Sequence, residues 1–444
     1  MSLRELLLSI PYFEKKKFLR ETEFLSAEKL HQIQAESLVR VINHAVTNAP
    51  YYRKRIDLSE MRTSTSPFEL IKKFPVIDKD CIRKHINEFL WGSKIRRIRA
   101  TTGGSTGQPF VFYMDRFRTR QMEKAFIFDQ WSRVGYRLGD PIFNLRGRIP
   151  NKQRLIQHDR FFNTYFASSF NLKFTTIKKY VDEINKIKPK YLHGYPSTIY
   201  QLASLMNRAN LKLKRSPKAI FCGSEKLFTY QRELIEKVFF SRVYSWYGHS
   251  EYLVLGGECE NSNSLHIYPQ YGYTELFPTG TKNAYGKDIY EIVATGFNNY
   301  IMPLIRYRTG DYAVLSDNQI CSCGRNYLLF DEVIGREQEF VVDLQGELVS
   351  ATSLIFGQHF RVFEGLNGLY LEQSVPGELK ILMKKNSVFN ENDFSEMRSR
   401  ITVLLGDRFK VIYDFTDEIP RSSIGKAKLV KQQLDIDRFF QKKA

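Results

Sequence analysis

The sequence predicts an α/β protein with a large multi-layer N-terminal domain, which contains parallel sheets, helices and a strand-rich subdomain, and a small α/β C-terminal domain. Two observations carry this prediction. Between residues 96 and 330, short β-rich runs alternate with helical stretches, an order typical of a parallel sheet flanked by helices. The chain also has 444 residues, which exceeds one ordinary hydrophobic core, so two or more domains are expected.

Residues 1–95 are expected to be helical. Ser26, with Lys29 three positions later, gives half of a capping box at the start of the clearest helix. Apolar residues then recur near helical spacing, at Leu30, Ile33, Leu38, Val41 and Ala45.

The β–α alternation that follows predicts strands whose carboxyl ends carry binding loops. The expected strands are residues 141–147, 190–195, 218–225 and 242–248, and the expected helices between them are 176–187, 198–210 and 230–239.

The last two parts of the chain are predicted from a change of pattern. Residues 259–334 are rich in strands and form the expected subdomain of a large domain that spans 1–334. After Gly335 a smaller α/β unit, 335–444, closes the chain. Its strands are expected near FVVDL, GLYLEQ and LKILMK.

Composition indicates a folded protein with a solvated basic face, which would also attract anionic ligands. Apolar residues make up 43% of the chain, and the formal net charge is +19. Nucleotides and acyl carriers are the anionic partners that this positive charge favours, and peripheral contact with an anionic membrane surface is possible as well. The lysines are scattered, without a long basic tract or an aromatic-basic RNA motif, so no nucleic-acid partner is expected.

The expected location is the cytoplasm. No apolar run approaches the ~20 residues of a transmembrane segment, and the N-terminus MSLRELLLSIPYF lacks the features of a signal peptide. Five cysteines, an odd number in so long a chain, do not make a disulfide framework and fit a reducing compartment.

The stretch TTGGSTGQPFVFY contains a loop of small polar residues. A Walker-type phosphate loop is excluded, because no Lys-Ser/Thr pair follows the last glycine. A G-x-S-x-G nucleophile elbow, the serine-hydrolase alternative, requires a helix where PFVFY predicts a strand. The remaining interpretation is a hairpin loop whose N–H groups and hydroxyls close over an anion, formed by Thr101, Thr102, Gly103, Gly104, Ser105, Thr106 and Gly107.

Seven motifs occur in an order that resembles one known superfamily. They are TTGGSTGQP, GYPS, CGSEKL, WYGHSE, YRTGD, GR and PRSSIGKAK. In this order they are similar to the adenylate-forming acyl-activating superfamily, and most similar to its phenylacetate–CoA ligase branch, which includes members found with capsular polysaccharide genes (CapK-like proteins). The N-terminal NAPYYRKRI is also similar to that branch, so the resemblance covers nearly the whole chain.

The resemblance implies ATP-dependent activation of a carboxylic acid through an acyl-adenylate. The Gly-rich hairpin would then cover the β- and γ-phosphates, and Asp311 would accept hydrogen bonds from both ribose hydroxyls. Arg336 would contact the ribose from the domain junction, near which the mobile small domain rotates. The residues that match the adenine-binding strip are Tyr247, Gly248, Gly223, Ser224 and Glu225.

The same resemblance assigns the catalytic residues. Glu251 matches the glutamate that holds Mg²⁺. Lys426 matches the lysine that steadies the α-phosphate and the carboxylate during adenylation, with Lys428 as the neighbour that competes for this assignment. His249 could line the acyl pocket, touch the α-phosphate or be a packed histidine.

The acid and its acceptor are left open by the sequence. The acyl pocket is expected around Tyr195, Pro196, Phe221 and His249. At the pivot, GREQEF departs from the paired acids usual in CoA-forming relatives, so the acceptor could be CoA, a carrier protein or an amine on a sugar. An inactive nucleotide-binding homologue is the main alternative to an enzyme, and a role in surface polysaccharide biosynthesis is a further expectation.

Two cysteine-containing pairs predict a structural zinc site. Cys259 and His266 have C-x6-H spacing, and Cys321 and Cys323 form C-x-C in a second polar, turn-rich segment. Four such ligands make a closed tetrahedral site if the fold brings them together. The alternative is reduced thiols beside a packed histidine.

Overall fold

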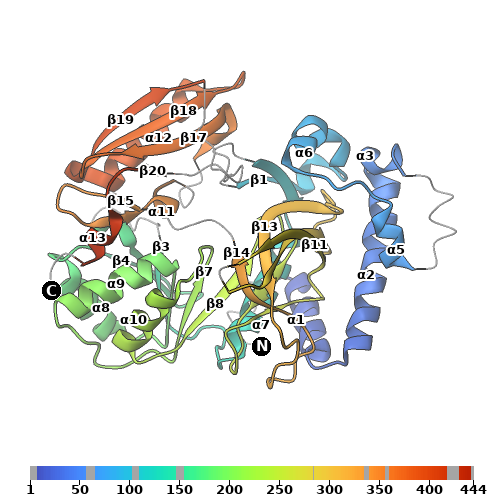
Figure 1. Cartoon of the computed structure of the whole chain (residues 1–444), viewed down its shortest axis with the longest axis horizontal. Coiled ribbons are helices and arrows are strands. Elements are labelled where there is room, and N and C mark those ends of the chain that lie inside the picture. The colour runs from blue at the N-terminus through green and yellow to red at the C-terminus, as the bar shows by residue number, and fades with distance from the viewer. Residues whose placement is uncertain are drawn as a thin grey trace. The chain divides into compact units, whose positions relative to one another are not determined.

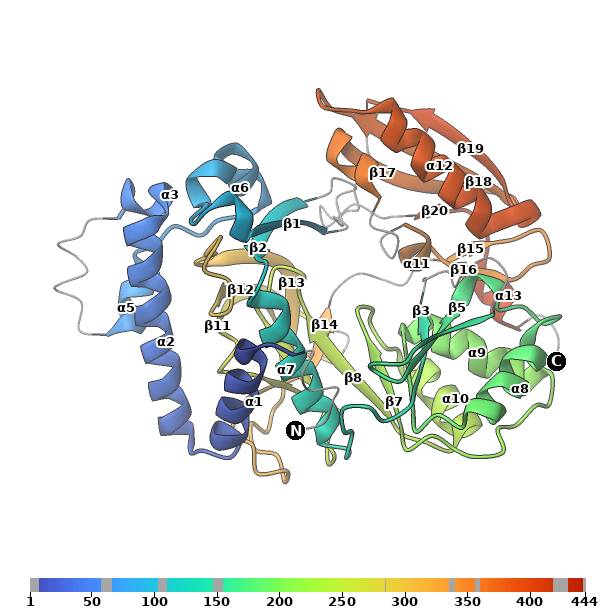
Figure 2. The same cartoon turned by 180° about the vertical axis from the view of Figure 1, so that it is seen from behind.

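The computed structural model describes residues 8–56, 66–102, 110–146, 155–283, 285–334, 340–355, 360–417 and 430–441. The chain divides into two compact units (Figures 1 and 2). The first unit is formed by residues 1–100, 112–138 and 244–335, and the second by 101–111, 139–243 and 336–444.

The first unit begins with the expected helices. Ser26 caps α2, where its side chain accepts a hydrogen bond from the backbone N–H of Lys29, and proline opens both α3 and α5. Helix α1 packs along α7 (Figure 2). The helices are α1 (Ile10–Thr22), α2 (Ala27–Asn48), α3 (Pro50–Arg53), α5 (Pro67–Lys72), α6 (Lys79–His85) and α7 (Thr119–Ser132), with 3₁₀ turns at Ile86–Phe89 and Lys94–Arg96.

The strands of the first unit run in the order β11-β12-β13-β14-β10-β9-β8, and the pairs along this order are antiparallel. They are β8 (Val243–Gly248), β9 (Leu255–Gly257), β10 (Leu265–Ile267), β11 (Gly272–Lys282), β12 (Asp288–Gly296), β13 (Tyr307–Leu315) and β14 (Leu328–Ile334). The strand-rich character expected for residues 259–334 is therefore present.

A separate two-stranded sheet joins β1 (Arg97–Thr102) to β2 (Phe110–Asp115). The expected strand after Pro109 is thus β2. It occupies the position where a nucleophile elbow would need a helix, so the fold argues against the hydrolase interpretation.

The second unit contains the predicted parallel sheet. Its order is β7-β6-β3-β5-β4, in which β3, β5, β6 and β7 are parallel and β4 is antiparallel. Helices α8, α9 and α10 share one hydrophobic core with β3, β6 and β7 (Figure 1). The elements are β3 (Ile142–Arg146), β4 (Ile156–Asp159), β5 (Thr164–Ser168), α8 (Ile177–Ile187), β6 (Tyr191–Gly194), α9 (Pro196–Arg208), β7 (Ala219–Gly223) and α10 (Thr229–Phe239), with a 3₁₀ turn at Ser169–Asn171.

The C-terminal part of the second unit is a four-stranded sheet, β19-β18-β17-β20, with α12 packed on it (Figure 2). Its elements are β15 (Phe340–Val342), β16 (Leu348–Ser350), α11 (Ala351–Ile355), β17 (Leu366–Gln373), β18 (Glu378–Lys385), α12 (Glu391–Leu405), β19 (Lys410–Phe415), β20 (Val430–Gln432) and α13 (Ile436–Gln441), with 3₁₀ turns at Arg361–Gly365 and Gly406–Arg408.

A buried arginine, Arg408, ties this part to the parallel-sheet part. Arg408 pairs with Asp343 at 3.3 Å, and its Nη2 donates to the backbone carbonyl of Phe170 at 2.6 Å. The division of the chain at residues 334 and 335, expected from the sequence, stays a prediction.

The predicted α/β class is confirmed by these elements. Among the described residues, no helix combines the length and apolarity that crossing a membrane demands.

Candidate functional site

Glu251 is a buried carboxylate held by a tyrosine from another strand. It follows β8, and the hydroxyl of Tyr307, at the start of β13, donates a hydrogen bond to its Oε1 at 3.3 Å. The two residues are 7% and 1% exposed. Burial, and next the charge of Glu251, raise the pKa of Tyr307 well above its ordinary value. The hydroxyl therefore keeps its proton and orients a carboxylate suited to a hard cation.

Asp311 on β13 is the centre of a second cluster, with Tyr247 on β8 and His249 directly after that strand. Tyr247 donates a hydrogen bond of 3.1 Å to Oδ2 of Asp311, and Nε2 of His249 lies 3.2 Å from the same oxygen. The Tyr247 hydroxyl lies 2.6 Å from Nε2 of His249. Burial, followed by the charge of Asp311, raises the pKa of Tyr247 well above its usual range. Because a carboxylate only accepts hydrogen bonds, tyrosine and imidazole act as donors that fix it.

His249 also presents a hydrogen-bonding atom that a ligand can complete. Its side chain is 9% exposed, and its buried Nδ1 has no hydrogen-bond partner among the described residues. Such a buried polar atom needs a partner. A ligand could supply that partner, and whether His249 lines the acyl pocket, touches the α-phosphate or is a packed histidine stays a prediction.

Three residues next to predicted site residues have backbone conformations in the left-handed region. Ser224, directly after β7, has φ 70°, Tyr252, directly after Glu251, has φ 63°, and Gly310, directly before Asp311, has φ 77°. For Ser224 and Tyr252 this conformation carries strain, which folded proteins retain mostly at functional sites.

The expected acyl-pocket residues of the second unit lie at the carboxyl ends of β6 and β7. Tyr195 precedes α9, and Pro196 is its first residue. Phe221 is 1% exposed and stacks on Tyr191 at 5.2 Å between ring centroids. Glu225, expected near adenine, accepts a hydrogen bond of 3.1 Å from the backbone N–H of Ser197. One of its oxygens therefore caps the first turn of α9.

Sequence reasoning missed three polar residues beside these. Asn144 and Arg146 on β3 and His193 on β6 are connected by hydrogen bonds. A signal was available, because polar side chains two residues apart in a buried parallel strand share one face.

The structure leaves part of the predicted site untested. Thr101 and Thr102 end β1, and Gly248, like Tyr247, belongs to β8, whereas Gly223, Ser224 and Glu225 belong to the other unit. The predicted site residues that lie outside the described residues are Gly103, Gly104, Ser105, Thr106, Gly107, Arg336 and Lys426.

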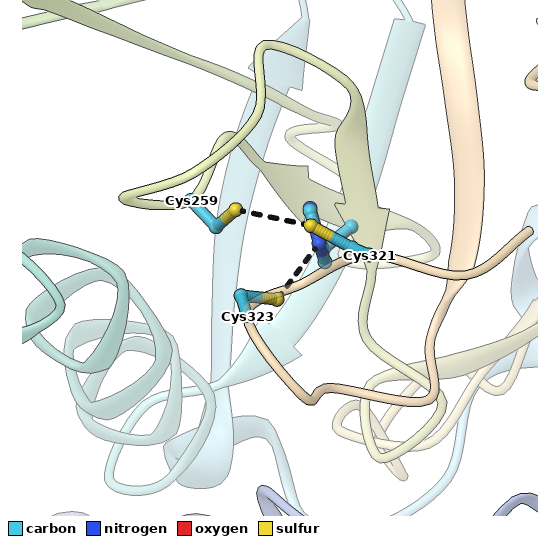
Figure 3. A group of neighbouring side chains, drawn as sticks. Cys259, Cys321 and Cys323 are labelled. Atoms are coloured by element: carbon cyan, nitrogen blue, oxygen red, sulfur yellow. Dashed lines mark hydrogen bonds between the residues drawn. The ribbon is translucent and has the colours of Figure 1, made fainter.

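The four predicted metal ligands converge in the first unit, and Figure 3 shows the three cysteines among them. One ligand atom from each of Cys259, His266, Cys321 and Cys323 lies within 4.8 Å of the others. The Sγ atoms of Cys259 and Cys321 are 3.6 Å apart, and Sγ of Cys323 lies 3.3 Å from Nε2 of His266. The fold thus gathers a group that could hold a metal ion.

The protonation of His266 fits this arrangement. Burial, and next Arg133, lower its pKa to about 4, so the ring is neutral. Its Nδ1 lies 3.0 Å from the carbonyl oxygen of Ser264, which can only accept, so Nδ1 carries the proton and Nε2 keeps the lone pair that points at the thiols.

The sequence of the chain is similar to the sequences of two named proteins. It is 25% identical to protein CapK of Staphylococcus aureus over 421 residues, which cover 94% of this chain and 91% of CapK. It is 24% identical to phenylacetate-coenzyme A ligase of Thermus thermophilus over 339 residues, which cover 72% of this chain and 74% of the ligase. No family model matches the chain. These similarities confirm the resemblance inferred from the motifs.

The fold is also similar to the folds of solved structures. The structure of 2-hydroxyisobutyryl-CoA ligase with 2-HIB-AMP and CoA in its thioesterification state has a TM-score of 0.56 and 20% identity, over 95% of this chain and 93% of that one. An open conformation of the same ligase gives a TM-score of 0.55 over 93% of both chains. This confirms the α/β fold at a low level of sequence identity.

Proposed function

We propose that the protein uses ATP to activate a carboxylic acid as an acyl-adenylate and then transfers the acyl group to CoA or to another thiol or amine acceptor. The Thermus relative is named a coenzyme A ligase, and the ligase class rests on this similarity. The observation that carries the mechanism is the placement of Asp311, on β13, and Glu251, in the segment after β8, each hydrogen-bonded by a tyrosine.

The Asp311 cluster is suited to bind ribose. Tyr247 and His249 both contact Oδ2, so the carboxylate is oriented before the nucleotide binds. Its side chain is 23% exposed, which leaves it accessible to a ligand. Two acceptor oxygens match the two hydroxyls of a ribose. With Nε2 donating to Asp311, the Nδ1 atom of a neutral His249 would accept a hydrogen bond from a donor group of the ligand.

Glu251 would hold Mg²⁺. An anionic oxygen ligand, oriented by Tyr307, fits a small hard cation that prefers carboxylates and phosphate oxygens. When bound, Mg²⁺ supplies positive charge against the phosphates of ATP. The chain's own contribution is to fix the carboxylate and to keep Tyr307 protonated.

The first half-reaction forms one bond and breaks one. A carboxylate oxygen of the acid attacks the α-phosphorus of ATP, and pyrophosphate leaves with the electron pair of the broken P–O bond. Lys426 would neutralise charge that develops on the α-phosphate and the carboxylate. Positioning and charge neutralisation then account for most of the rate.

In the second half-reaction the acceptor attacks the acyl carbonyl, and AMP leaves. A thiol or amine gives up its proton in this step. CoA is the acceptor that the Thermus relative's name favours. A carrier protein, an amino sugar, a place in surface polysaccharide biosynthesis and a cytoplasmic location stay predictions.

The cysteine–histidine cluster would hold a structural Zn²⁺. Three thiols and a neutral imidazole are a ligand set that zinc prefers, and four protein ligands leave no open position for catalysis. Cys259, His266, Cys321 and Cys323 would tie the segment after β9 and strand β10 to the segment between β13 and β14.

Trapping of the activated acyl group tests the function. The protein is incubated with Mg-ATP, hydroxylamine and panels of aryl, fatty, amino and sugar acids, and acyl hydroxamate and AMP are measured. Stoichiometric AMP and hydroxamate with one class of acid support the proposal. ATP binding without either product, across all panels, would favour the inactive nucleotide-binding homologue.

A further inference from the structure

A row of polar side chains crosses the parallel sheet of the second unit. Strands β3 and β6 are neighbours, and Asn144 is in register with His193, so the two residues lie side by side on one face. Arg146, two residues after Asn144, lies on the same face at the carboxyl end of β3. Asn144 and His193 are each 8% exposed, in strands whose other residues are mostly buried and apolar.

The hydrogen bonds of this row determine which groups are donors. Nη2 of Arg146 lies 3.1 Å from Nε2 of His193, and because a guanidinium only donates, Nε2 accepts. A neutral imidazole then carries its proton on Nδ1, which lies 3.0 Å from the side-chain amide of Asn144. Only the amide oxygen can accept this proton, so the oxygen must face Nδ1. The side-chain amide can be turned to place it there, because its oxygen and nitrogen have nearly the same shape.

The neutral state of His193 follows from its surroundings. Burial, and next the charge of Arg146, lower its pKa well below the ordinary value. A second proton on Nε2 would face the guanidinium directly. The row therefore has one stable arrangement, in which Arg146 donates to His193 and His193 donates to Asn144.

In this arrangement two groups of the row have no hydrogen-bond partner among the described residues, and both are donors. One terminal atom of the Asn144 amide has no partner among the described residues, and with the oxygen turned to His193 it is the NH₂ group. The buried Nε–H of Arg146 has no partner there either. Leaving two buried donors unpaired is costly, so they call for an oxygen-rich ligand.

Within the described part of the chain, the guanidinium of Arg146 has no carboxylate within ion-pair distance, although the charge of Glu225 also acts on Tyr195. The guanidinium lies over the ring of Tyr195 at 4.8 Å. A buried or half-buried cation ordinarily has an anionic partner. The missing counter-charge therefore points to a negatively charged ligand rather than to a neutral one.

The row lies among the residues expected to form the acyl pocket. The guanidinium of Arg146 lies over the ring of Tyr195, and Phe221 on β7 is in register with His193. Carboxyl ends of parallel strands are the usual place for ligands in such sheets. The pocket wall formed by Tyr195 and Phe221 is thus apolar and aromatic, and the polar row supplies a cation beside it.

We infer that the acid activated by this protein is a dicarboxylic acid, whose second carboxylate accepts hydrogen bonds from Nε of Arg146 and from the amide of Asn144. The inference rests on the proposed function, because it assumes that this face of the sheet belongs to the acyl pocket. A site built to hydrogen-bond a charged group discriminates strongly against analogues that lack it.

Matched acids test the inference in the full-length protein. Acid-dependent exchange of pyrophosphate into ATP is measured with succinate against butyrate, glutarate against pentanoate, and adipate against hexanoate, with 4-hydroxybutyrate as a neutral polar analogue. We expect kcat/KM to be about 10- to 100-fold higher for at least one diacid than for its monoacid, the range that charge-assisted hydrogen bonds supply. Preference for the monoacids or for the hydroxy acid would overturn the inference.

Variants assign the preference to the row. Arg146→Met should abolish the diacid preference, because the second carboxylate loses its cationic partner, and Asn144→Asp should weaken the preference by adding an opposing charge. Arg208→Met is the matched control, because Arg208 also lies over an aromatic ring, that of Phe174 at 5.3 Å, and should keep the preference. An equal loss for all acids in Arg146→Met would contradict the inference, since Arg146 would then act on the reacting carboxylate.

Direct binding keeps the inference testable if Arg146→Met does not fold. The wild-type protein with AMP present should bind the preferred diacid at least 10-fold more tightly than its monoacid in calorimetry, and equal binding would overturn the inference. Failure of the proposed function is recognised separately, because it gives no exchange with any acid, whereas failure of the inference gives exchange without a diacid preference.

Discussion

The hydroxyl of Tyr307 donates a hydrogen bond of 3.3 Å to Oε1 of Glu251, and both side chains are buried. The two residues are separated by 56 positions in the chain and meet because β8 and β13 belong to the same unit. Tyr307→Phe removes this donor and keeps the ring. We expect the Mg²⁺ concentration for half-maximal exchange to rise several-fold and kcat to fall about 10-fold.

The measurement for Tyr307→Phe is a Mg²⁺ titration of pyrophosphate exchange. Tyr273→Phe serves as the matched control, since Tyr273 lies half-buried on β11 of the same unit. An unchanged Mg²⁺ dependence in Tyr307→Phe, with normal folding, would show that Tyr307 does not position Glu251.

Asp311→Asn tests recognition of the ribose. The wild-type enzyme should use ATP at least 10-fold better than 2′-deoxy-ATP, because a fixed carboxylate accepts from the 2′-hydroxyl. In Asp311→Asn we expect KM for ATP to rise about 10- to 100-fold and most of this discrimination to disappear. Asp317→Asn, at a side chain that is 82% exposed, should change neither quantity. Retained discrimination in Asp311→Asn would contradict the assignment.

Glu123 makes the stability of the fold depend on pH. Burial raises its pKa to about 7, while the hydrogen bond from Tyr271 acts in the opposite direction. Between its unfolded pKa near 4.5 and its folded pKa near 7, the folded state binds more protons than the unfolded state. The free energy of unfolding therefore falls as pH rises through this window, by about 3 kcal/mol in total, and is constant above it.

Glu123→Gln checks this prediction. Glutamine keeps an acceptor for the Tyr271 hydroxyl and cannot ionise, so the variant should be more stable than wild type above pH 7 and should lose most of the slope between pH 4.5 and 7. Urea denaturation at a series of pH values measures both. Parallel pH profiles for the two proteins would contradict a raised pKa.

The metal centre predicts one zinc ion per chain. Cys321→Ser should lose the ion and lower the melting temperature, because the segment between β13 and β14 loses its link to β10. Cys81→Ser, outside the cluster, should retain it. Elemental analysis of both purified variants and of wild type is the measurement, and a zinc content near zero in wild type would refute the zinc site.

Local hydrophobic patterns in the sequence predicted most helices and strands of the parallel-sheet region, but not the side-chain contacts between them. The alternation of β-rich runs and amphipathic helices placed β3, α8, β6, α9, β7, α10 and β8 close to their observed bounds. Strands β4 and β5 were missed, because short segments such as IQHD at an edge carry little apolar signal. Helix α12 and strand β19 were missed as well.

The candidate site shows the same limit. Motif order predicted Glu251 and Asp311, and the spacing of two cysteine-containing pairs predicted the four cysteine–histidine ligands. The pairing of Tyr307 with Glu251 joins residues 56 positions apart, and no local pattern indicates it. The row of Asn144, Arg146 and His193 had a local signal, polar residues in buried strands, that was outweighed by the apolar pattern around it. Lys426 and the Gly-rich loop stay predictions from the motifs.

Carboxylate-dependent exchange of labelled pyrophosphate into ATP tests the central claim most directly. It is measured in wild type, in Lys426→Ala and in the control Lys428→Ala. The account predicts exchange with one class of acid, a loss of about 100-fold or more in Lys426→Ala, and near-normal exchange in Lys428→Ala. Absence of ATP binding and of exchange with every acid, in a folded wild-type protein, would contradict it.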